Sequence, residues 1–533
     1  MTMQRILTLP VVRLAVALGL AGLGLTAAPA PASASTVPVS GSGSSWASVA
    51  IDQWAQDLRP NGIVVNYNAD GSAAGRQSWI QDQYDFAGSD PPFRDGTDVL
   101  GGTGREVVPF TYSYVPDTAG GTAFMYHIDV AGHLITNLRL SGGTIMKIFT
   151  GQITNWDDPT ITKDYGAQLP NLPIIPVIRS DGSGATFFLT RWMAHMFPSD
   201  WNAFCQHVHP GIQGNCPQTE FYPQFGNAKA ENGSNNVATY ITSSFGNGAI
   251  GYDEYAYALN SHFPVVKVLN PGGYFVLPSA SNVAVALTKA VIDENPKDPN
   301  FLQQNLDNVY TYTDPRSYPL SSYSYLIVPR SPKPPLEFAT PAGKGLTLTS
   351  YINFMLCDGQ KQMPQLGYSP LPENLVVGGL QQANQIPGHG TVIGPGSLNQ
   401  CGNPTMQNGK NVLLANAPYP SPCDKLGAPL NCVVVNGKAT AAGGGTSPTT
   451  GPSTGPSASA NPTTGVGTTG TGIGGPGGTA TGGQVTGQVV NLAADQTSKT
   501  IFGVLTALGV IAAVALPPAI AGWLRRRRGQ AHG

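Results

Sequence analysis

The chain contains 533 residues, only 11% of which are charged, and its formal net charge is −2. A single hydrophobic core stops growing at roughly 250–300 residues, so the length predicts two lobes rather than one core in the globular part. Because the globular part has no run of basic residues, the composition argues against nucleic acid or another polyanion as a partner.

The first 34 residues predict a secretory signal peptide. Arg5 and Arg13 flank the start of this segment, an apolar run follows over 14–25, and Ala32-Ser33-Ala34 supplies the small residues of a cleavage site. An uncleaved N-terminal anchor is the alternative. In both cases the globular part is expected outside the cytoplasm.

Two turns in the N-terminal part each lead into a helix and expose hydroxyl groups. The first, over 41–46, reads Gly-Ser-Gly-Ser-Ser-Trp and precedes an apolar pattern at helical spacing that includes Trp54. The second follows a strand over 63–67, reads Asn-Tyr-Asn-Ala-Asp-Gly-Ser over 66–72, and opens a helix at Ala73. Each turn therefore offers hydroxyls beside the free backbone N–H groups of a helix start.

A third turn, over 179–184, reads Arg-Ser-Asp-Gly-Ser-Gly. An apolar strand over 172–178 leads into it, and apolar residues at helical spacing follow it over 187–196. The free N–H groups and the positive dipole end of that helix attract anions. The planar guanidinium of Arg179 suits a tetrahedral oxyanion, and Ser183 adds a hydroxyl. The sequence predicts an oxyanion site here; a glycine-rich turn with a surface arginine is the alternative.

A carboxylate stands at the end of another strand, in Phe-Ala-Gly-Ser-Asp-Pro-Pro over 86–92. An acid beside an anion is repulsive unless the anion itself carries a proton. Monohydrogen phosphate can donate a hydrogen bond to Asp90, whereas fully ionised sulfate cannot and would leave two negative charges opposed. Because the wrong ligand leaves a buried polar group unpaired, such a site is expected to discriminate strongly.

The six cysteines of an exported chain predict disulfides rather than a redox centre. Other connectivities stay open, but nearness in the sequence favours the pairs Cys205–Cys216 and Cys423–Cys432, which leaves Cys357–Cys401. The run Cys205-Gln-His207-Val-His209 is a possible metal cluster. We do not favour it, because an oxidised cysteine cannot bind a metal and no second ligand group follows at a defined spacing. We expect no metal and no cofactor.

Residues 376–436 carry three of these cysteines and are expected to form a disulfide-pinned extension packed on one lobe. From 437 to 490 the chain is rich in Gly, Ser, Thr and Pro with almost no charge, so it cannot bury enough apolar surface to fold. The low-complexity core of this linker, roughly 438–484, has about 45–50 residues, and as a flexible chain its ends would lie about 40 Å apart.

The segment over 501–524 is strongly apolar, and the tail over 525–533 begins with four arginines. About 20 apolar residues span a bilayer, and a basic cluster directly after a span stays on the cytoplasmic side. We expect a retained transmembrane helix, kinked near its inner end by Pro517 and Pro518, with a short cytoplasmic basic tail. A buried helix of the globular part is the alternative, which the intervening linker disfavours.

The three turns and the Asp90 stretch resemble the PstS family, the phosphate-binding proteins of the bacterial phosphate ABC transporter. Connecting stretches match in the same order, among them Thr-Asn-Trp-Asp-Asp-Pro over 154–159 and Gly-Ala-Ile-Gly-Tyr over 248–252. The matching pieces span roughly residues 38–375. The resemblance implies an α/β fold, the two-lobed periplasmic-binding-protein fold of type II, with mostly parallel sheets and hinge crossovers.

Applied to this chain, the resemblance implies that lobe I takes residues 35–120 and 270–375 and that lobe II takes 121–269. The ligand would be gripped between the lobes, by the side chains of Ser45, Ser72, Asp90, Arg179 and Ser183 and by the backbone N–H groups of Trp46, Gly184 and Ala185. Asp181 would orient the guanidinium of Arg179 by a carboxylate–guanidinium pair.

Two residues depart from the family pattern. Trp46 stands where the family usually has Phe, which is tolerable because its backbone N–H is expected to bind. Ala185 stands where the family usually has Thr, so one side-chain hydroxyl is absent. Thr186 is the next residue, but one helical step turns its side chain by about 100°, so it does not substitute.

The resemblance implies an extracytoplasmic receptor, not an enzyme, that binds inorganic phosphate and delivers it to an ABC permease. No cysteine precedes Cys205, so the lipid-modified N-terminal cysteine of many Gram-positive members is lacking, and the C-terminal helix would hold the protein on the cell membrane. A phosphate sensor or scavenger without transport and a phosphatase on the same fold are the alternatives. No histidine lies in the four motifs and Ser45 has no apparent base beside it, which disfavours the phosphatase.

Overall fold

The computed structural model of the protein describes residues 36–212, 214–330, 343–406 and 410–442, all of which belong to one compact unit. The predicted signal peptide, the linker beyond residue 442, the transmembrane helix over 501–524 and the basic tail lie outside the described residues. Within the described ranges, no helix has the length and the apolar character needed to cross a membrane.

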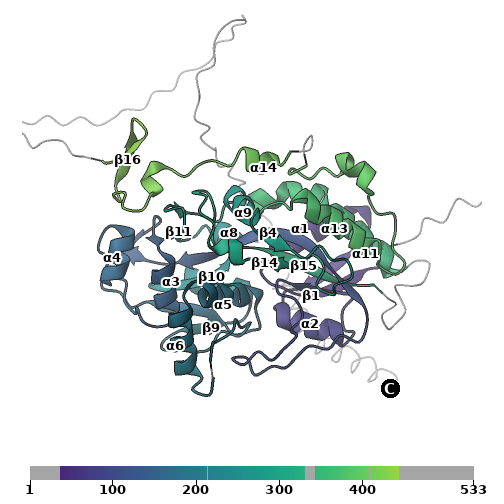
Figure 1. The fold of residues 1–533 in the computed structure, drawn as a ribbon, viewed down its shortest axis with the longest axis horizontal. Helices are drawn as coiled ribbons and strands as arrows, with labels where there is room; N and C mark the ends of the chain where they lie inside the picture. Colours follow the sequence, from purple (N-terminus) through teal and green to yellow (C-terminus); the bar gives the residue numbers. More distant parts are fainter. Residues whose placement is uncertain (1–35, 213, 331–342, 407–409, 443–533) are drawn as a thin grey trace, which may run out of the picture. The chain divides into compact units, whose positions relative to one another are not determined.

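An eight-stranded sheet forms the centre of the described part (Figure 1). In spatial order its strands are β2 (Val65–Asn68), β1 (Val39–Gly43), β3 (Phe86–Ser89), β15 (Ser321–Pro329), β4 (Tyr112–Tyr126), β10 (Ala249–Glu254), β8 (Ile175–Arg179) and β9 (Lys229–Glu231). The α/β fold class predicted from the sequence is confirmed.

The expectation of mostly parallel sheets holds only for the outer strands. β1 pairs in parallel with β2 and β3, and β8 pairs in parallel with β10 and β9. The middle is antiparallel: the first part of β4 pairs with β15 and its last part pairs with β10. The chain returns along β15, which also pairs antiparallel with β3. β4 and β15 therefore join the two halves of the sheet.

Helices pack against both halves of this sheet, and those of seven residues or more are α1 (Ser48–Leu58), α2 (Ser72–Ile80), α3 (Gly142–Phe149), α4 (Pro159–Tyr165), α5 (Gly184–Met196), α6 (Pro198–Val208), α7 (Gly233–Thr242), α8 (Tyr255–Ser261), α9 (Ala280–Leu287), α11 (Lys344–Leu356) and α13 (Glu373–Ala383). Shorter helices are α10 (Asp307–Tyr310), α12 (Met363–Leu366) and α14 (Val412–Ala415). Further short strands are β5 (Asp129–Val130), β6 (His133–Leu134), β7 (Arg139–Leu140), β11 (Lys267–Leu269), β12 (Phe275–Val276), β13 (Val291–Ile292), β14 (Gln304–Asn305), β16 (Cys432–Val435) and β17 (Lys438–Ala441).

The helices and strands predicted around the three turns are present, with small shifts at their ends. α1 buries Trp54 on the apolar face that the sequence indicated, and α2 begins at Ser72, one residue before the predicted start. Gly75 of α2 lies directly against the backbone of Gly43, where a Cβ atom would overlap the Gly43 Cα. A glycine is therefore needed for α2 to lie this close to β1.

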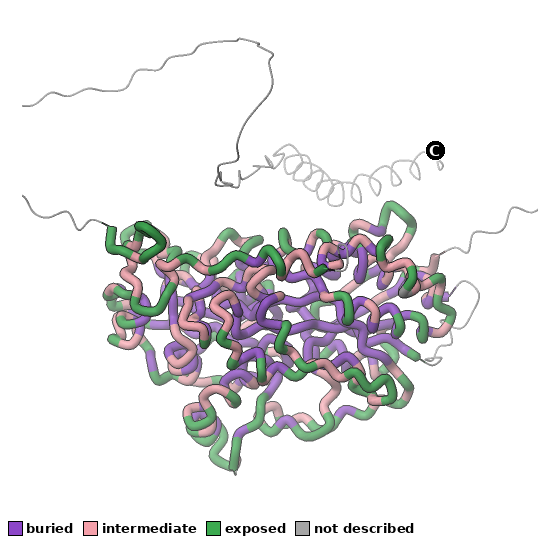
Figure 2. The backbone as a smooth tube through the Cα atoms, turned by 45° about the horizontal axis from the view of Figure 1, so that its top comes forward, coloured by how far each residue is buried: buried purple, intermediate pink, exposed green. Residues whose placement is uncertain are grey.

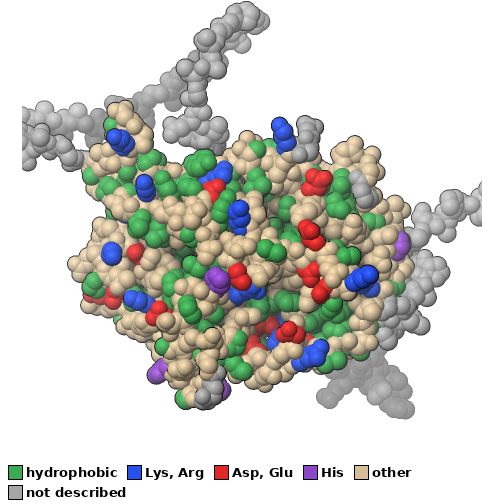
Figure 3. Space-filling model, viewed as in Figure 1, with side chains coloured by type: hydrophobic (Ala, Val, Ile, Leu, Met, Phe, Trp, Pro, Cys, Tyr) green, Lys and Arg blue, Asp and Glu red, His purple; other side chains and the backbone are tan. Residues whose placement is uncertain are grey.

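The joining strands are also the most deeply buried part of the sheet. β15 is buried at every residue and β4 at every residue after the first; the interior strands in Figure 2 are correspondingly purple. On the face shown in Figure 3, lysine, arginine and acidic side chains are scattered singly among polar and apolar groups.

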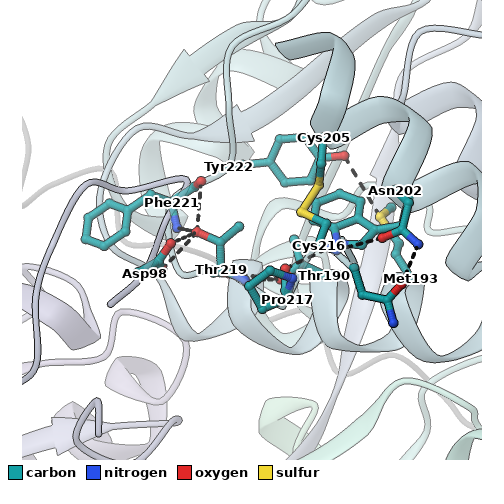
Figure 4. The surroundings of a disulfide bond; sticks show 12 residues. Asp98, Thr190, Met193, Asn202, Cys205, Cys216, Pro217, Thr219, Phe221 and Tyr222 are labelled. Carbon is teal, nitrogen blue, oxygen red and sulfur yellow. Dashed lines mark hydrogen bonds between the residues drawn. A yellow bond between two sulfur atoms is a disulfide. The ribbon is translucent and has the colours of Figure 1, made fainter. Parts of the chain in front are cut away.

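The three disulfides are Cys205–Cys216, Cys357–Cys401 and Cys423–Cys432, so the favoured connectivity is confirmed. Figure 4 shows the first of them beside the loop that follows Cys216. In this loop, Thr219 donates a hydrogen bond to Asp98 and its carbonyl accepts one from Thr190 on α5. The disulfide and these bonds hold the loop in place next to α5.

The extension over 376–436 was expected on one lobe, but it contacts both halves of the described part. It starts with α13, which packs against β4, and the Cys357–Cys401 disulfide ties it to the end of α11. Further along, the carbonyl of Ala428 accepts a hydrogen bond from Arg139 at 2.6 Å, and Asp424 pairs with Lys267 at 2.6 Å. Figure 1 shows this course from α13 past α14 to β16.

Candidate functional site

The turns singled out in the sequence meet at one place in the sheet. β1 ends just before Ser45, β3 just before Asp90, and β8 at Arg179; because β1 and β3 are parallel, their carboxyl ends lie side by side. Ser72 opens α2 and Ser183 precedes α5. All five side chains belong to residues that are at most 3% exposed, so the structure closes them off from solvent.

The Asp90 carboxylate is surrounded by hydroxyl donors. Ser44 Oγ lies 2.8 Å from Asp90 Oδ1 and 3.0 Å from Oδ2, and Ser72 Oγ donates to Oδ2 at 3.1 Å. Burial raises the pKa of Asp90, whereas hydrogen bonds from Ser324, Ser44 and Ser72 and the positive charge of Arg179 oppose the rise. The site thus holds a buried carboxylate whose charged form is supported by neighbouring donors.

The Arg179 guanidinium is held by a carboxylate on its own turn. Arg179 Nε donates to Asp181 Oδ1 at 2.8 Å and Nη2 donates to Asp181 Oδ2, as the sequence predicted for Asp181. Burial disfavours the charge, but the pairing with Asp181 outweighs it, so the pKa of Arg179 is raised. The remaining donors face Ser45 Oγ, 2.8 Å from Nη2, and Ser234 Oγ, 3.2 Å from Nη1.

The first turn of α5 lies against Asp90. Ser183 Oγ accepts a hydrogen bond from the N–H of Thr186 at 3.4 Å and so caps the helix. A Cβ atom at Gly184 would overlap Asp90 Oδ2, so only glycine lets the helix start come this close to the carboxylate. Thr186 is the residue after Ala185, and its Oγ1 is hydrogen-bonded to the hydroxyl of Tyr252 at 2.7 Å. This hydroxyl is therefore already engaged.

Trp46 contributes its backbone rather than its ring to this region. The indole packs edge-on against Tyr368 with 5.8 Å between ring centroids, and its outer edge fills the space at Gly120. The Trp46 carbonyl accepts a hydrogen bond from the Tyr368 hydroxyl at 2.6 Å. The predicted role of Trp46 therefore depends on its backbone N–H.

Two residues beside Arg179 were not singled out from the sequence. Ser234, near the start of α7, contacts both Ser45 and Arg179. Asp253, at the end of β10, is 3% exposed and its pKa is raised to about 6, because burial outweighs the opposing effects of the Arg179 charge and the Ser234 hydroxyl. The signal for Ser234 was present: Asn-Gly-Ser over 232–234 follows a strand and opens a helix, like Gly71-Ser72.

A buried cluster of ion pairs also joins loops that are far apart in the sequence. Arg76 of α2 is fully buried and pairs with Glu106 at 3.0 Å and with Glu220 at 2.6 Å. Arg94 contacts the same two carboxylates at 3.4 and 3.1 Å. Glu220 follows Thr219 in the loop beyond the Cys205–Cys216 disulfide, so this loop places its carboxylate between two arginines.

The arrangement suits an anion that carries a proton. Arg179 and the starts of α2, α5 and α7 supply positive charge or N–H donors, while Asp90 supplies one acceptor. Within the described ranges, no group of three or more His, Cys, Asp or Glu side chains could hold a metal ion. Cys205 is in a disulfide, so it cannot join His207 and His209 in a metal site.

The model of the PBP superfamily domain matches residues 26–359 of the chain. Among curated proteins, the phosphate-binding protein PstS of Xylella fastidiosa (strain Temecula1) is 29% identical over 328 residues, 61% of this chain and 79% of the relative. The protein of the same name from Methanocaldococcus jannaschii is 26% identical over 344 residues, 63% and 83% of the two chains. Among solved structures, the phosphate-binding protein of Stenotrophomonas maltophilia is 16% identical, with a TM-score of 0.46 and coverage of 70% and 99%.

We expect Asp253 to make the stability of the ligand-free protein depend on pH. Its folded-state pKa of about 6 lies above its ordinary value of 3.8, so its contribution is complete below about pH 4 and is lost as the pH rises through 6. Two pKa units correspond to at most about 3 kcal/mol. The free energy of unfolding, measured with urea, should fall from pH 4 to pH 7.5 in the unaltered protein. In Asp253→Asn this fall should be smaller by about the same amount. Asp95→Asn, at an exposed carboxylate, is the control and should change nothing; an equal pH dependence in Asp253→Asn would contradict the prediction.

Proposed function

Because the chain belongs to the PBP superfamily, of periplasmic-binding-protein fold, we propose that it is an extracytoplasmic phosphate receptor of the PstS type that delivers inorganic phosphate to an ABC permease. The observation that carries the proposal is the Asp90 carboxylate, buried among the hydroxyls of Ser44 and Ser72 and next to the start of α5. A buried acid in an anion site requires a ligand that can donate a proton, and hydrogen phosphate is such a ligand.

The names of the relatives support the same ligand. The matched proteins of Xylella fastidiosa and Methanocaldococcus jannaschii are both named phosphate-binding protein PstS. The chain covers about four fifths of each of these relatives. The protein is accordingly a transport receptor rather than an enzyme, and phosphate is its ligand rather than a cofactor.

The proposed roles of the site residues follow from their donors and charges. Asp90 accepts a hydrogen bond from the protonated phosphate oxygen. Arg179 binds two further oxygens with its planar guanidinium, which Asp181 keeps in orientation. The hydroxyls of Ser45, Ser72 and Ser183 and the backbone N–H groups of Trp46, Gly184 and Ala185 donate to the oxygens. As phosphate arrives, Ser72 turns its hydroxyl from Asp90 to the ligand, and Asp90 accepts a hydrogen bond from the protonated oxygen of the ligand in exchange.

The two groups of site residues come from different parts of the sheet. Ser45, Ser72 and Asp90 lie around β1 and β3, and Arg179 and Ser183 lie around β8. We propose that residues 35–120 and 270–375 form one lobe and 121–269 the other, and that β4 crosses from the first lobe to the second. A ligand that contacts both lobes favours the closed arrangement by its greater affinity for it.

We also propose that the receptor is exported by its N-terminal signal peptide and held on the outer face of the cell membrane by a single helix over 501–524. The uninterrupted apolar composition of this segment and the arginines that follow it support the proposal. The linker would let the tethered receptor reach a permease in the same membrane, since its reach is about 40 Å.

Replacing the site arginine should abolish tight phosphate binding. Calorimetric titration of the full-length protein with phosphate is expected to show saturable binding, and Arg179→Ala should weaken it at least hundredfold, because the anion loses its charged partner and Asp181 is left unpaired. Arg191→Ala is the matched control, since Arg191 lies further along α5 and pairs with Asp307. Unchanged affinity in Arg179→Ala, or steady hydrolysis of a chromogenic phosphate ester by the unaltered protein, would contradict the proposal.

Restoring the hydroxyl that the family usually carries at position 185 should tighten binding. One additional neutral hydrogen bond contributes about 1 kcal/mol, so Ala185→Thr is expected to lower the phosphate Kd roughly fivefold in the same titration. Ala194→Thr, on the same helix but ten residues from its start, should leave the Kd unchanged. Equal affinities for Ala185→Thr and the unaltered protein would show that no donor is lacking there.

A further inference from the structure

A fourth helix start points at the site. α7 is ten residues long, and its first two backbone N–H groups are directed at site residues: Gly233 donates to Asp181 Oδ1 at 2.9 Å and Ser234 donates to Ser45 Oγ at 3.2 Å. Ser234 is fully buried, and its own hydroxyl lies 2.8 Å from Ser45 Oγ. The sequence pattern led to only three helix starts at this site.

The hydrogen bonds between Arg179, Ser45 and Ser234 leave one hydroxyl proton unused. Ser45 Oγ accepts from Arg179 Nη2 and from the N–H of Ser234, which fills the two acceptor positions of a hydroxyl. The Ser45 proton is therefore donated to Ser234 Oγ, which also accepts from Arg179 Nη1. With both of its acceptor positions used, Ser234 keeps its own hydroxyl proton to donate to another group.

On the side of Ser234 that faces Ser45 and Arg179, donors outnumber acceptors. The guanidinium of Arg179, the hydroxyl of Ser45 and the N–H of Ser234 all donate to two hydroxyl oxygens, those of Ser45 and Ser234, and the hydroxyl proton of Ser234 is left over. An oxyanion offers several lone pairs on each oxygen and can accept from every one of these groups at once. A helix start adds the favourable end of the α7 dipole.

We propose that Ser234 is a further phosphate-binding residue, which donates its hydroxyl and its backbone N–H to the same side of the anion as Ser45 and Arg179. This inference rests on the proposed function. It supplies a hydroxyl donor that the start of α5 lacks. Ala185 offers no hydroxyl and the hydroxyl of Thr186 is bonded to Tyr252, whereas Ser234 adds a hydroxyl from α7.

Asp253 holds Ser234 ready for this role. The Ser234 hydroxyl favours the charged form of the Asp253 carboxylate, whose Oδ2 has no hydrogen-bond partner among the described residues. When no anion is bound, Asp253 can accept the spare proton of Ser234. When the anion binds, that proton turns to the ligand.

The test is calorimetric titration of the full-length protein with sodium phosphate. Ser234→Ala should weaken phosphate binding roughly tenfold, as expected for one hydrogen bond to an anion. Ser113→Ala is the matched control: Ser113 is equally buried, but its hydroxyl donates to Gln382, away from the site. Binding by the unaltered protein together with unchanged affinity in Ser234→Ala would overturn the inference alone, whereas no binding by the unaltered protein would overturn the proposed function.

A second comparison separates direct binding from an effect exerted through the arginine. If Ser234 only positioned Arg179, its removal would have no further effect in an Arg179→Lys background, where the contact to Nη1 no longer exists. We expect the double variant to bind phosphate roughly tenfold more weakly than Arg179→Lys alone; equal binding would overturn the inference.

Should Ser234→Ala fail to fold, the crystal structure of the unaltered protein with phosphate decides. Ser234 Oγ is expected within about 3.2 Å of a phosphate oxygen. A Ser234 hydroxyl turned to Asp253 in the occupied site would contradict the proposal.

Discussion

The proposed anion site depends on one electrostatic constraint, a buried carboxylate beside the bound anion. Asp90 cannot be hydrated, because it is 2% exposed and lies against the Gly184 end of α5. Its charge must be balanced by donors, and the structure supplies the hydroxyls of Ser44 and Ser72. A fully ionised ligand would add repulsion, while a ligand with a proton becomes a donor itself. We therefore attribute the proposed selectivity of the site to Asp90, one acceptor among many donors.

The rest of the fold positions the groups that satisfy this constraint. β4 pairs with β15 in one half of the sheet and with β10 in the other, so Asp90 and Arg179 lie on one framework. The buried Arg76–Glu220 pair, 2.6 Å apart, joins α2 of the first half to the loop between α6 and β9 of the second half. Because separating a buried pair leaves two unpaired charges, this contact favours the arrangement in which the two halves meet. The extension over 376–436 adds contacts to both halves from the opposite end of the chain.

The sequence predicted the residues that form local patterns, and missed contacts between distant segments. Strand–glycine–serine–helix turns pointed to Ser45, Ser72 and Arg179, because each turn is a local pattern. Two disulfides followed from nearness in the chain, and the third, between cysteines 44 residues apart, was the pair left over. The antiparallel middle of the sheet was not predicted, since the pairing of β15 with β4 joins residues some 200 positions apart. The ion pair of Arg76 with Glu220 and the contact of Ser234 with Ser45 were missed for the same reason: each partner alone is an ordinary polar residue.

The most direct test of the central claim compares phosphate with sulfate in Asp90→Asn and in the unaltered protein, by calorimetry at one pH. The account predicts that the unaltered protein prefers phosphate by at least a thousandfold, because sulfate would leave the carboxylate facing a second negative charge. It also predicts that Asp90→Asn loses most of this preference, since an amide can donate to either anion. Equal affinity of the unaltered protein for the two anions, or an undiminished preference in Asp90→Asn, would contradict the account.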